Sequence, residues 1–184
     1  MRKTWWITVL LAAAMLLPLT GCGEPEADVS IFVMTQPAPD MEAVEKMEAE
    51  LEKQLGDKAV DLIVSPLFSI EKLIVETAVA THGVFILNEK PVKDFATQGA
   101  FLPLDDTFSP EDYPEGVIDM TITEGETEKT VTGLYVIPVD QTDWFRLGGY
   151  NGETAYAYVP VNAPNPELAK KALKAIVDWK TQAE

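Results

Sequence analysis

One short segment contains three side chains with the chemistry to bind a small polar molecule. Residues 138–150 follow an expected strand and place Trp144 two positions before Arg146, with Asp140 near the start. An aromatic ring stacks on flat ligands, and a guanidinium binds anions or sugar hydroxyls through its fork of donors, while Asp140 would orient the loop. The alternative is a helical turn capped by Asp140 or Thr142, with Trp144 in the core. The sequence leaves both interpretations open.

A second group of candidate binding residues follows the first three expected strands, one after each. These residues are Gln36, Phe68 and Asn88. In open α/β sheets, ligands approach the carboxyl ends of parallel strands, so polar and aromatic side chains there can orient a solute. The alternative is that they are ordinary loop residues, since such polar residues are common in turns.

Enzyme motifs are absent from the sequence. There is no Gly-x-Ser-x-Gly, no phosphate-binding loop and no dinucleotide fingerprint. The single histidine, His82, comes at the end of an apolar helix, where a structural role is expected, and one histidine without a free cysteine does not make a zinc site. Glu124, Glu126 and Glu128 are expected to be solvated in a hairpin turn. We therefore expect a protein that is not an enzyme and needs no metal or cofactor.

The N-terminus has the pattern of a secretory signal. Arg2 and Lys3 precede an apolar stretch over residues 5–19, and small residues follow it. The apolar stretch is shorter than the ~20 residues needed to cross a bilayer, which disfavours a permanent transmembrane helix.

The end of this segment, Leu19-Thr20-Gly21-Cys22, resembles the lipobox of bacterial lipoproteins. The resemblance implies diacylglycerol on the Cys22 thiol and cleavage after Gly21, so that residues 1–21 are a signal peptide. Two acyl chains anchor a protein stably, whereas one does so only marginally. Cys22 is the only cysteine, which excludes a disulfide. The alternative is an ordinary secretory signal with a coincidental cysteine.

Length and charge limit what the mature chain can do. Removing residues 1–21 leaves 163 residues, enough for one domain, which we place at 29–184 after a tether at 22–28. The removed segment takes Arg2 and Lys3 with it, so 12 basic residues oppose 30 acidic ones, a net charge of −18. This charge argues against nucleic acid and anionic lipid headgroups as partners.

The elements that would position these residues alternate between strand and helix in the first half of the chain. Strands are expected at 29–35, 59–65 and 83–88, and helices at 40–55, 69–81 and 91–98. The helix at 69–81 has little polar surface, which predicts that it is the most buried helix. Further strands at 117–123, 130–139 and 154–161 precede a last helix capped by Asn165. The pattern predicts an α/β fold with a βαβαβα start, a partly parallel sheet, antiparallel β additions and a C-terminal helix.

Two stretches resemble bacterial extracellular solute-binding proteins of ABC transporters. One is Gly83 to Phe108, which contains the phrase Gly99-Ala100-Phe101-Leu102-Pro103-Leu104-Asp105-Asp106, and the other is Tyr158 to Asn162 with Asn165 to Ala169. The resemblance implies one lobe of a periplasmic-binding-protein-like fold, because the chain is too short for two lobes.

The combined hypothesis is a lipoprotein anchored on the extracytoplasmic face of the cell membrane through acylated Cys22. Its single lobe would bind a small solute or a protein partner, such as a membrane transporter or an envelope protein, without catalysis. The alternative is an accessory envelope lipoprotein that acts only through protein–protein contacts. A deep cleft would favour the first hypothesis, and a flat apolar patch would favour the second.

Overall fold

The computed structural model describes residues 27–56, 58–96, 98–124 and 127–181 of the chain. The predicted signal peptide and Cys22 lie outside the described residues, as does the predicted tether up to residue 26. Within the described ranges, no helix is both long and apolar enough to cross a membrane.

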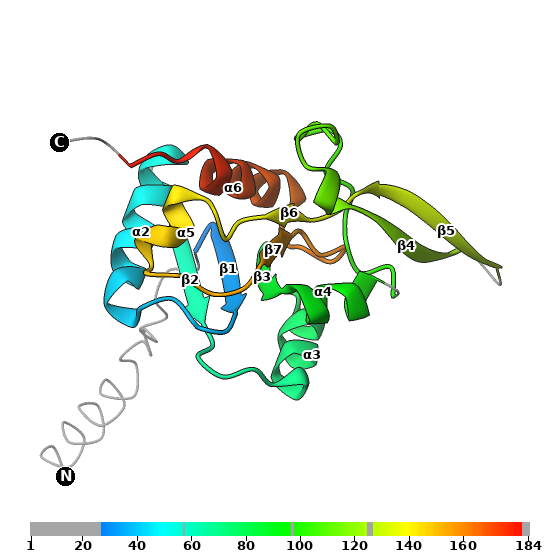
Figure 1. Cartoon of the computed structure of the whole chain (residues 1–184), viewed down its shortest axis with the longest axis horizontal. Coiled ribbons are helices and arrows are strands. Elements are labelled where there is room, and N and C mark those ends of the chain that lie inside the picture. Colours follow the sequence, from blue (N-terminus) through cyan, green and yellow to red (C-terminus); the bar gives the residue numbers. More distant parts are fainter. Residues whose placement is uncertain (1–26, 57, 97, 125–126, 182–184) are drawn as a thin grey trace, which may run out of the picture.

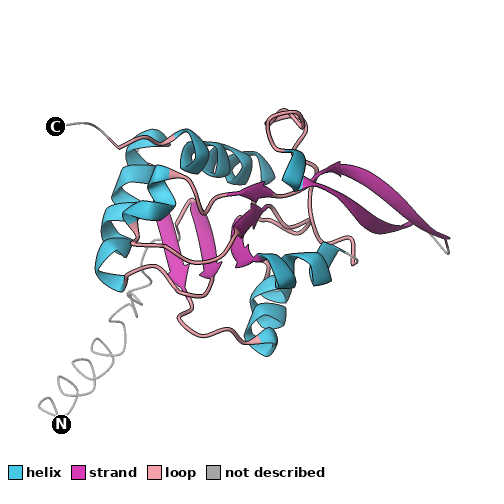
Figure 2. Cartoon of the chain, viewed as in Figure 1, coloured by secondary structure: helices cyan, strands magenta, loops and turns pink. Residues whose placement is uncertain are grey.

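A five-stranded mixed sheet forms the centre of the α/β fold (Figures 1 and 2). Its strands, in spatial order, are β2 (Val60–Val64), β1 (Val29–Met34), β3 (Val84–Asn88), β7 (Ala155–Tyr158) and β6 (Ile137–Pro138). The first three are parallel neighbours, which confirms the predicted start of the fold. Strand β7 pairs antiparallel with β3, and β6 pairs antiparallel with β7.

Helices cover both faces of this sheet and create two apolar cores. The alternation of side chains along β1 sends Ile31 and Val33 into one core and Phe32 and Met34 into the other. The first core also receives side chains from α2 (Met41–Gln54), α5 (Asp143–Leu147) and α6 (Pro166–Asp178). The second receives them from α3 (Ile70–Val79) and α4 (Glu89–Ala96).

The predicted helix starts are confirmed by side-chain caps. Asp40 accepts the backbone N–H of Glu42 before α2, and Ser69 and Asn165 cap α3 and α6. Such caps satisfy N–H groups that have no partner within the helix. Helix α4 begins two residues earlier than expected, so its proline lies in the first turn, where no intrahelical N–H bond is lost.

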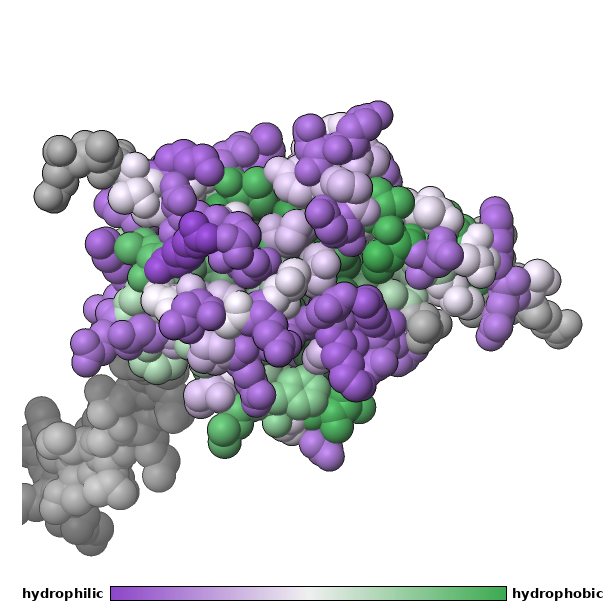
Figure 3. Space-filling model, viewed as in Figure 1, coloured by the Kyte–Doolittle hydropathy of each residue, from purple (hydrophilic) through white to green (hydrophobic). Residues whose placement is uncertain are grey.

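The prediction that the helix after Ser69 is the most buried one is wrong. Leu73 is its one fully buried apolar side chain, whereas Ile74 is 54% exposed and Val75 and Val79 are more than half exposed. Figure 3 shows apolar atoms gathered at the lower edge of the molecule, where α3 lies in Figure 1. Leu73, on one side of α3, packs into the second core with Phe32 of β1 and Phe85 of β3, and no described element covers the other side. Apolar composition produces burial only where a second element covers the helix.

The expected strand at 130–139 is divided between two sheets. Residues 127–134 form β5, which pairs with β4 (Val117–Glu124) in a hairpin that projects from the body (Figure 1), and residues 137–138 form β6 in the main sheet. A short 3₁₀ helix, η1 (Pro114–Gly116), leads into the hairpin. A Cβ atom on Gly116 would lie 1.9 Å from the carbonyl oxygen of Val136, so the close approach of these two backbone segments requires glycine.

Candidate functional site

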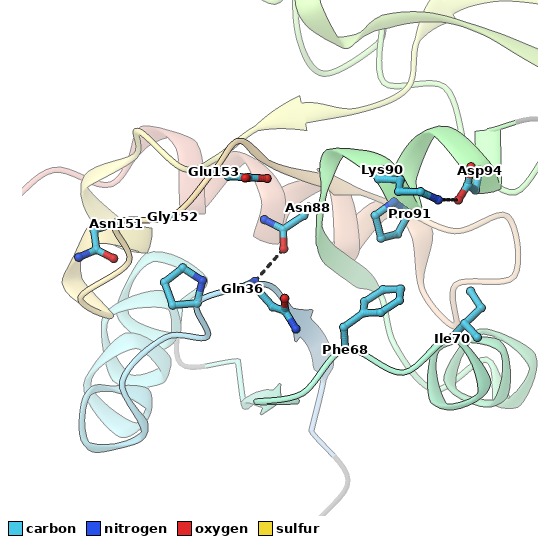
Figure 4. Close-up of a pocket in the computed structure, with 11 residues that line it drawn as sticks. Gln36, Phe68, Ile70, Asn88, Lys90, Pro91, Asp94, Asn151, Gly152 and Glu153 are labelled. Carbon is cyan, nitrogen blue, oxygen red and sulfur yellow. Dashed lines mark hydrogen bonds and ion pairs between the residues drawn. The ribbon is translucent and has the colours of Figure 1, made fainter.

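A pocket of about 570 Å³ lies at the carboxyl ends of the parallel strands (Figure 4). Gln36 follows β1, Phe68 follows β2 and Asn88 ends β3, and all three line the pocket, so the structure brings the predicted strand-end residues together. The remaining lining residues come from these loops, from α3 and α4 and from the segment before β7: Pro37, Ile70, Lys90, Pro91, Asp94, Asn151, Gly152 and Glu153.

A chain of hydrogen bonds fixes the floor of the pocket. The backbone N–H of Gln36 donates to Asn88 Oδ1 at 2.7 Å, and Asn88 Nδ2 donates to the hydroxyl of Tyr150 at 3.1 Å. That hydroxyl donates in turn to the carbonyl oxygen of Glu153 at 2.6 Å. Burial raises the pKa of the Tyr150 phenol, and the phenol is a neutral donor at neutral pH even at its ordinary pKa. The network ties the ends of β1 and β3 to the segment before β7.

The wall beside α3 and α4 is apolar and accessible. Phe68 is 43% exposed, and Figure 4 shows its ring directed toward Pro91, with Ile70 further along the same wall. Pro91 itself is buried, so the partly exposed phenyl ring of Phe68 is the flat surface on which an apolar or aromatic group can stack.

The charged lining residues differ in how they are paired. Lys90 Nζ lies 2.9 Å from an Asp94 carboxylate oxygen. The Glu153 carboxylate extends over Asn88 in Figure 4 and forms no ion pair within the described ranges of the chain. The lining therefore carries one uncompensated negative charge.

The predicted contacts in the 140–150 segment do not belong to this pocket. Trp144 is fully buried and its indole N–H donates to the carbonyl oxygen of Met47 at 2.9 Å, so the alternative of a core residue is correct. Arg146 is exposed and its guanidinium bonds to the side chain of Gln141. The Asp140 carboxylate accepts the Gln141 side-chain amide at 2.7 Å and the backbone N–H of Ala155 at 3.4 Å. These contacts close the turn that directly follows β6 and tie it to the first residue of β7.

The turn is followed by α5, whose N-cap is Thr142 and not Asp140. The side chain of Thr142 accepts the backbone N–H of Phe145 at 3.2 Å. This helix packs its two aromatic residues against α2 and the core, which is why they are unavailable to a ligand.

Sequence reasoning missed the lining residues Asn151, Gly152 and Glu153. They lie beside the predicted segment but reach the pocket only because β7 runs antiparallel to β3, with Ala155 opposite Asn88. The residues that precede β7 therefore meet the carboxyl end of β3. The polar composition before an expected strand was the only signal, and it does not reveal the strand's neighbour.

The single histidine lies at the opposite end of the sheet, against the start of β1. His82 is buried, with Nδ1 2.8 Å from the Ser30 hydroxyl and Nε2 3.0 Å from a Glu76 carboxylate oxygen. Its ring also packs against Phe32 and Phe85. Because both ring nitrogens are engaged and the ring is enclosed, these contacts connect α3 to β1 and fit the structural role that the sequence predicts.

Neither a cluster of metal-binding side chains nor a match to a known protein assigns a function to this site. The described residues contain no group of three or more histidine, cysteine, aspartate or glutamate side chains arranged to hold a metal ion. No protein-family model matches the chain, and neither a curated protein nor a solved structure matches it. The strand-end pocket is therefore the feature of the chain from which a function can be inferred.

Proposed function

We propose that the chain is a non-catalytic lipoprotein, anchored on the extracytoplasmic face of the cell membrane, that binds a small solute in the strand-end pocket. The observation that carries the proposal is the convergence of Gln36, Phe68 and Asn88 from three separate strands on one pocket. Its volume of about 570 Å³ lies within the range of small-molecule sites, and it combines an apolar wall with a few polar groups, as such sites do. The domain would be one lobe of a solute-binding-protein-like fold.

The anchoring part of the proposal is tested at Cys22. Cys22→Ser removes the thiol that would accept diacylglycerol, so the variant should lose fatty-acid labelling and leave the membrane fraction. Metabolic labelling and fractionation measure both effects. A variant that still incorporates labelled fatty acid would contradict acylation at this position.

The binding part is tested with two adjacent substitutions in the full chain. Phe68→Ala removes the stacking surface, whereas Leu67→Ala removes a neighbouring side chain that is more exposed and does not line the pocket. Thermal-shift measurements with amino acids, sugars, amines and metal ions should find a solute that stabilises the wild type and Leu67→Ala but not Phe68→Ala. If no solute raises the melting temperature, or if Phe68→Ala responds like the wild type, the pocket is not the binding site.

One observation favours a second candidate function, that of an accessory envelope lipoprotein acting through protein contacts. The outer side of α3 exposes Ile74, Val75 and Val79 to solvent, an apolar surface distinct from Ile70, which lines the pocket. Such surfaces are common where proteins associate. A photocrosslinker at Ile74 should then give a product in cells that Val79→Glu abolishes, whereas a crosslinker at Glu128 on the hairpin should give none.

A further inference from the structure

We infer that the strand-end pocket is built for a small organic cation, a protonated amine attached to an apolar or aromatic body. The inference rests on the proposed solute binding and names the class of ligand. Three features of the pocket carry it: an uncompensated carboxylate, an apolar wall on the other side, and neutral amide groups between them.

The charged side chains that line the pocket favour a positively charged ligand. Lys90, its one cation, is 87% exposed and already lies against Asp94, so an anionic ligand would compete with an existing ion pair. Glu153 is also exposed, but it has no ion-pair partner among the described residues, and its carboxylate is directed over Asn88 (Figure 4). A ligand ammonium group would supply the missing positive charge.

The opposite wall selects the body of the ligand. In Figure 4, Phe68 and Pro91 lie on the other side of Asn88 from Gly152 and Asn151. A flat apolar body can stack on Phe68 while its ammonium group points toward Glu153. The negative face of the phenyl ring also attracts a cation, by ~0.5–1 kcal/mol at exposed sites.

The floor between the two walls is polar and uncharged. It presents the side-chain amides of Gln36 and Asn88, which can orient a ligand without selecting an anion. A neutral ligand with the same body would lack the charge–charge attraction that an ammonium group gains from the exposed Glu153 carboxylate. The net charge of the chain, −16 for the whole sequence, further enriches cations at its surface.

Three probes that share one body and differ in charge test the inference. They are 2-phenylethylamine, 2-phenylethanol and 3-phenylpropionate, added to the isotope-labelled full chain in detergent, and the side-chain amide NMR signals of Gln36 and Asn88 report binding. We expect the amine to bind about tenfold more tightly than the alcohol, and the carboxylate to bind most weakly. Glu153→Gln should reduce the preference for the amine over the alcohol by about three- to fivefold. The matched control is Glu128→Gln, which makes the same charge change on an exposed hairpin residue outside the pocket and should retain the preference.

The possible results separate the ligand class from solute binding itself. If the alcohol or the carboxylate shifts the Gln36 and Asn88 signals at concentrations as low as the amine does, the cation inference is wrong while the pocket remains a solute site. The inference is equally wrong if Glu153→Gln keeps the full preference, or if none of the three probes shifts these signals. In that last case the wider solute panel with Phe68→Ala still decides whether the pocket binds any solute.

Discussion

The hydroxyl of Tyr158 is fully buried and has no hydrogen-bond partner among the described residues. Its ring packs between Phe85 and Phe101, with centroid distances of 5.5 and 4.1 Å, and burial raises the pKa of the phenol. Because an unsatisfied buried polar group costs roughly 1–3 kcal/mol, Tyr158→Phe should increase the free energy of unfolding by about 1 kcal/mol or more. Urea denaturation measures the change. A clear loss of stability would mean that the hydroxyl does have a partner in solution.

Single residues also show where sequence reasoning ends. The segment containing Trp144 and Arg146 allowed either a ligand contact or a core helix, and the deciding hydrogen bond is to Met47, 97 positions away in the chain. The strand-end residues were predictable because parallel neighbours in an α/β sheet end at the same edge. Glu153 was not, because its place depends on which strand pairs with β3.

At the scale of elements, α3 provides a direct comparison between its two faces. Leu73 is fully buried between the helix and the sheet, whereas its neighbour Ile74 is more than half exposed. Leu73→Ala should therefore lower the free energy of unfolding by roughly 2–5 kcal/mol, and Ile74→Ala by less than about 1 kcal/mol. Chemical denaturation of the two variants measures both values. Similar losses at the two sites would mean that something covers the outer face of α3 in solution.

The contact between α2 and β2 predicts a pH effect on stability. The Glu48 carboxylate accepts the backbone N–H of Leu62 at 2.8 Å. Desolvation nonetheless raises the pKa of Glu48, helped by the nearby carboxylate of Asp61. A raised pKa means that the folded state holds this proton more tightly than the unfolded state does. Its contribution to stability is thus present below the ordinary pKa and is lost as pH rises through the raised value.

Glu48→Gln is the substitution that tests this effect. Glutamine retains an acceptor for the Leu62 N–H and removes the desolvated charge, so the variant should be more stable than the wild type at pH 7. The difference should shrink as the pH falls through the pKa of Glu48. Denaturation curves between pH 3.5 and 7.5, values chosen to bracket carboxylate titration, measure the trend, and Glu128→Gln serves as the exposed control. A gain that is the same at every pH would contradict the assigned cause.

Element boundaries were predictable where the signal is local. The helix caps at Asp40, Ser69 and Asn165 depend on a few adjacent residues, and the structure has them. The division of residues 130–139 between β5 and β6 depends on two different partner strands, and periodicity along one strand contains no information about its partners. The exposure of α3 has the same origin, because burial depends on the elements around a helix.

In the molecule as a whole, the pocket combines the ends of parallel strands, which were predictable from the sequence, with the loop before β7, which was not. The parallel direction of β1, β2 and β3 follows from the helical connections between them, and it brings three loops to one edge. The antiparallel addition of β7 then brings the loop before that strand to the same edge. A parallel β7 would place this loop at the other end of the sheet, beside His82, and leave the pocket without Glu153.

The net charge of the chain predicts how ionic strength affects the proposed cation site. With 30 acidic and 14 basic residues in the whole sequence, the surface potential concentrates cations near the molecule, and salt screens this effect with a Debye length of about 10 Å at 0.1 M. The affinity for 2-phenylethylamine should therefore fall severalfold between low salt and roughly 0.5 M salt, while that for 2-phenylethanol should stay constant. Titrations at several salt concentrations measure both.

Glu153→Gln should lower the amine affinity at every salt concentration, because a contact at close range is screened less than the field of distant charges. If Glu128→Gln lowered it equally, the preference for cations would come from the net charge alone and not from the pocket.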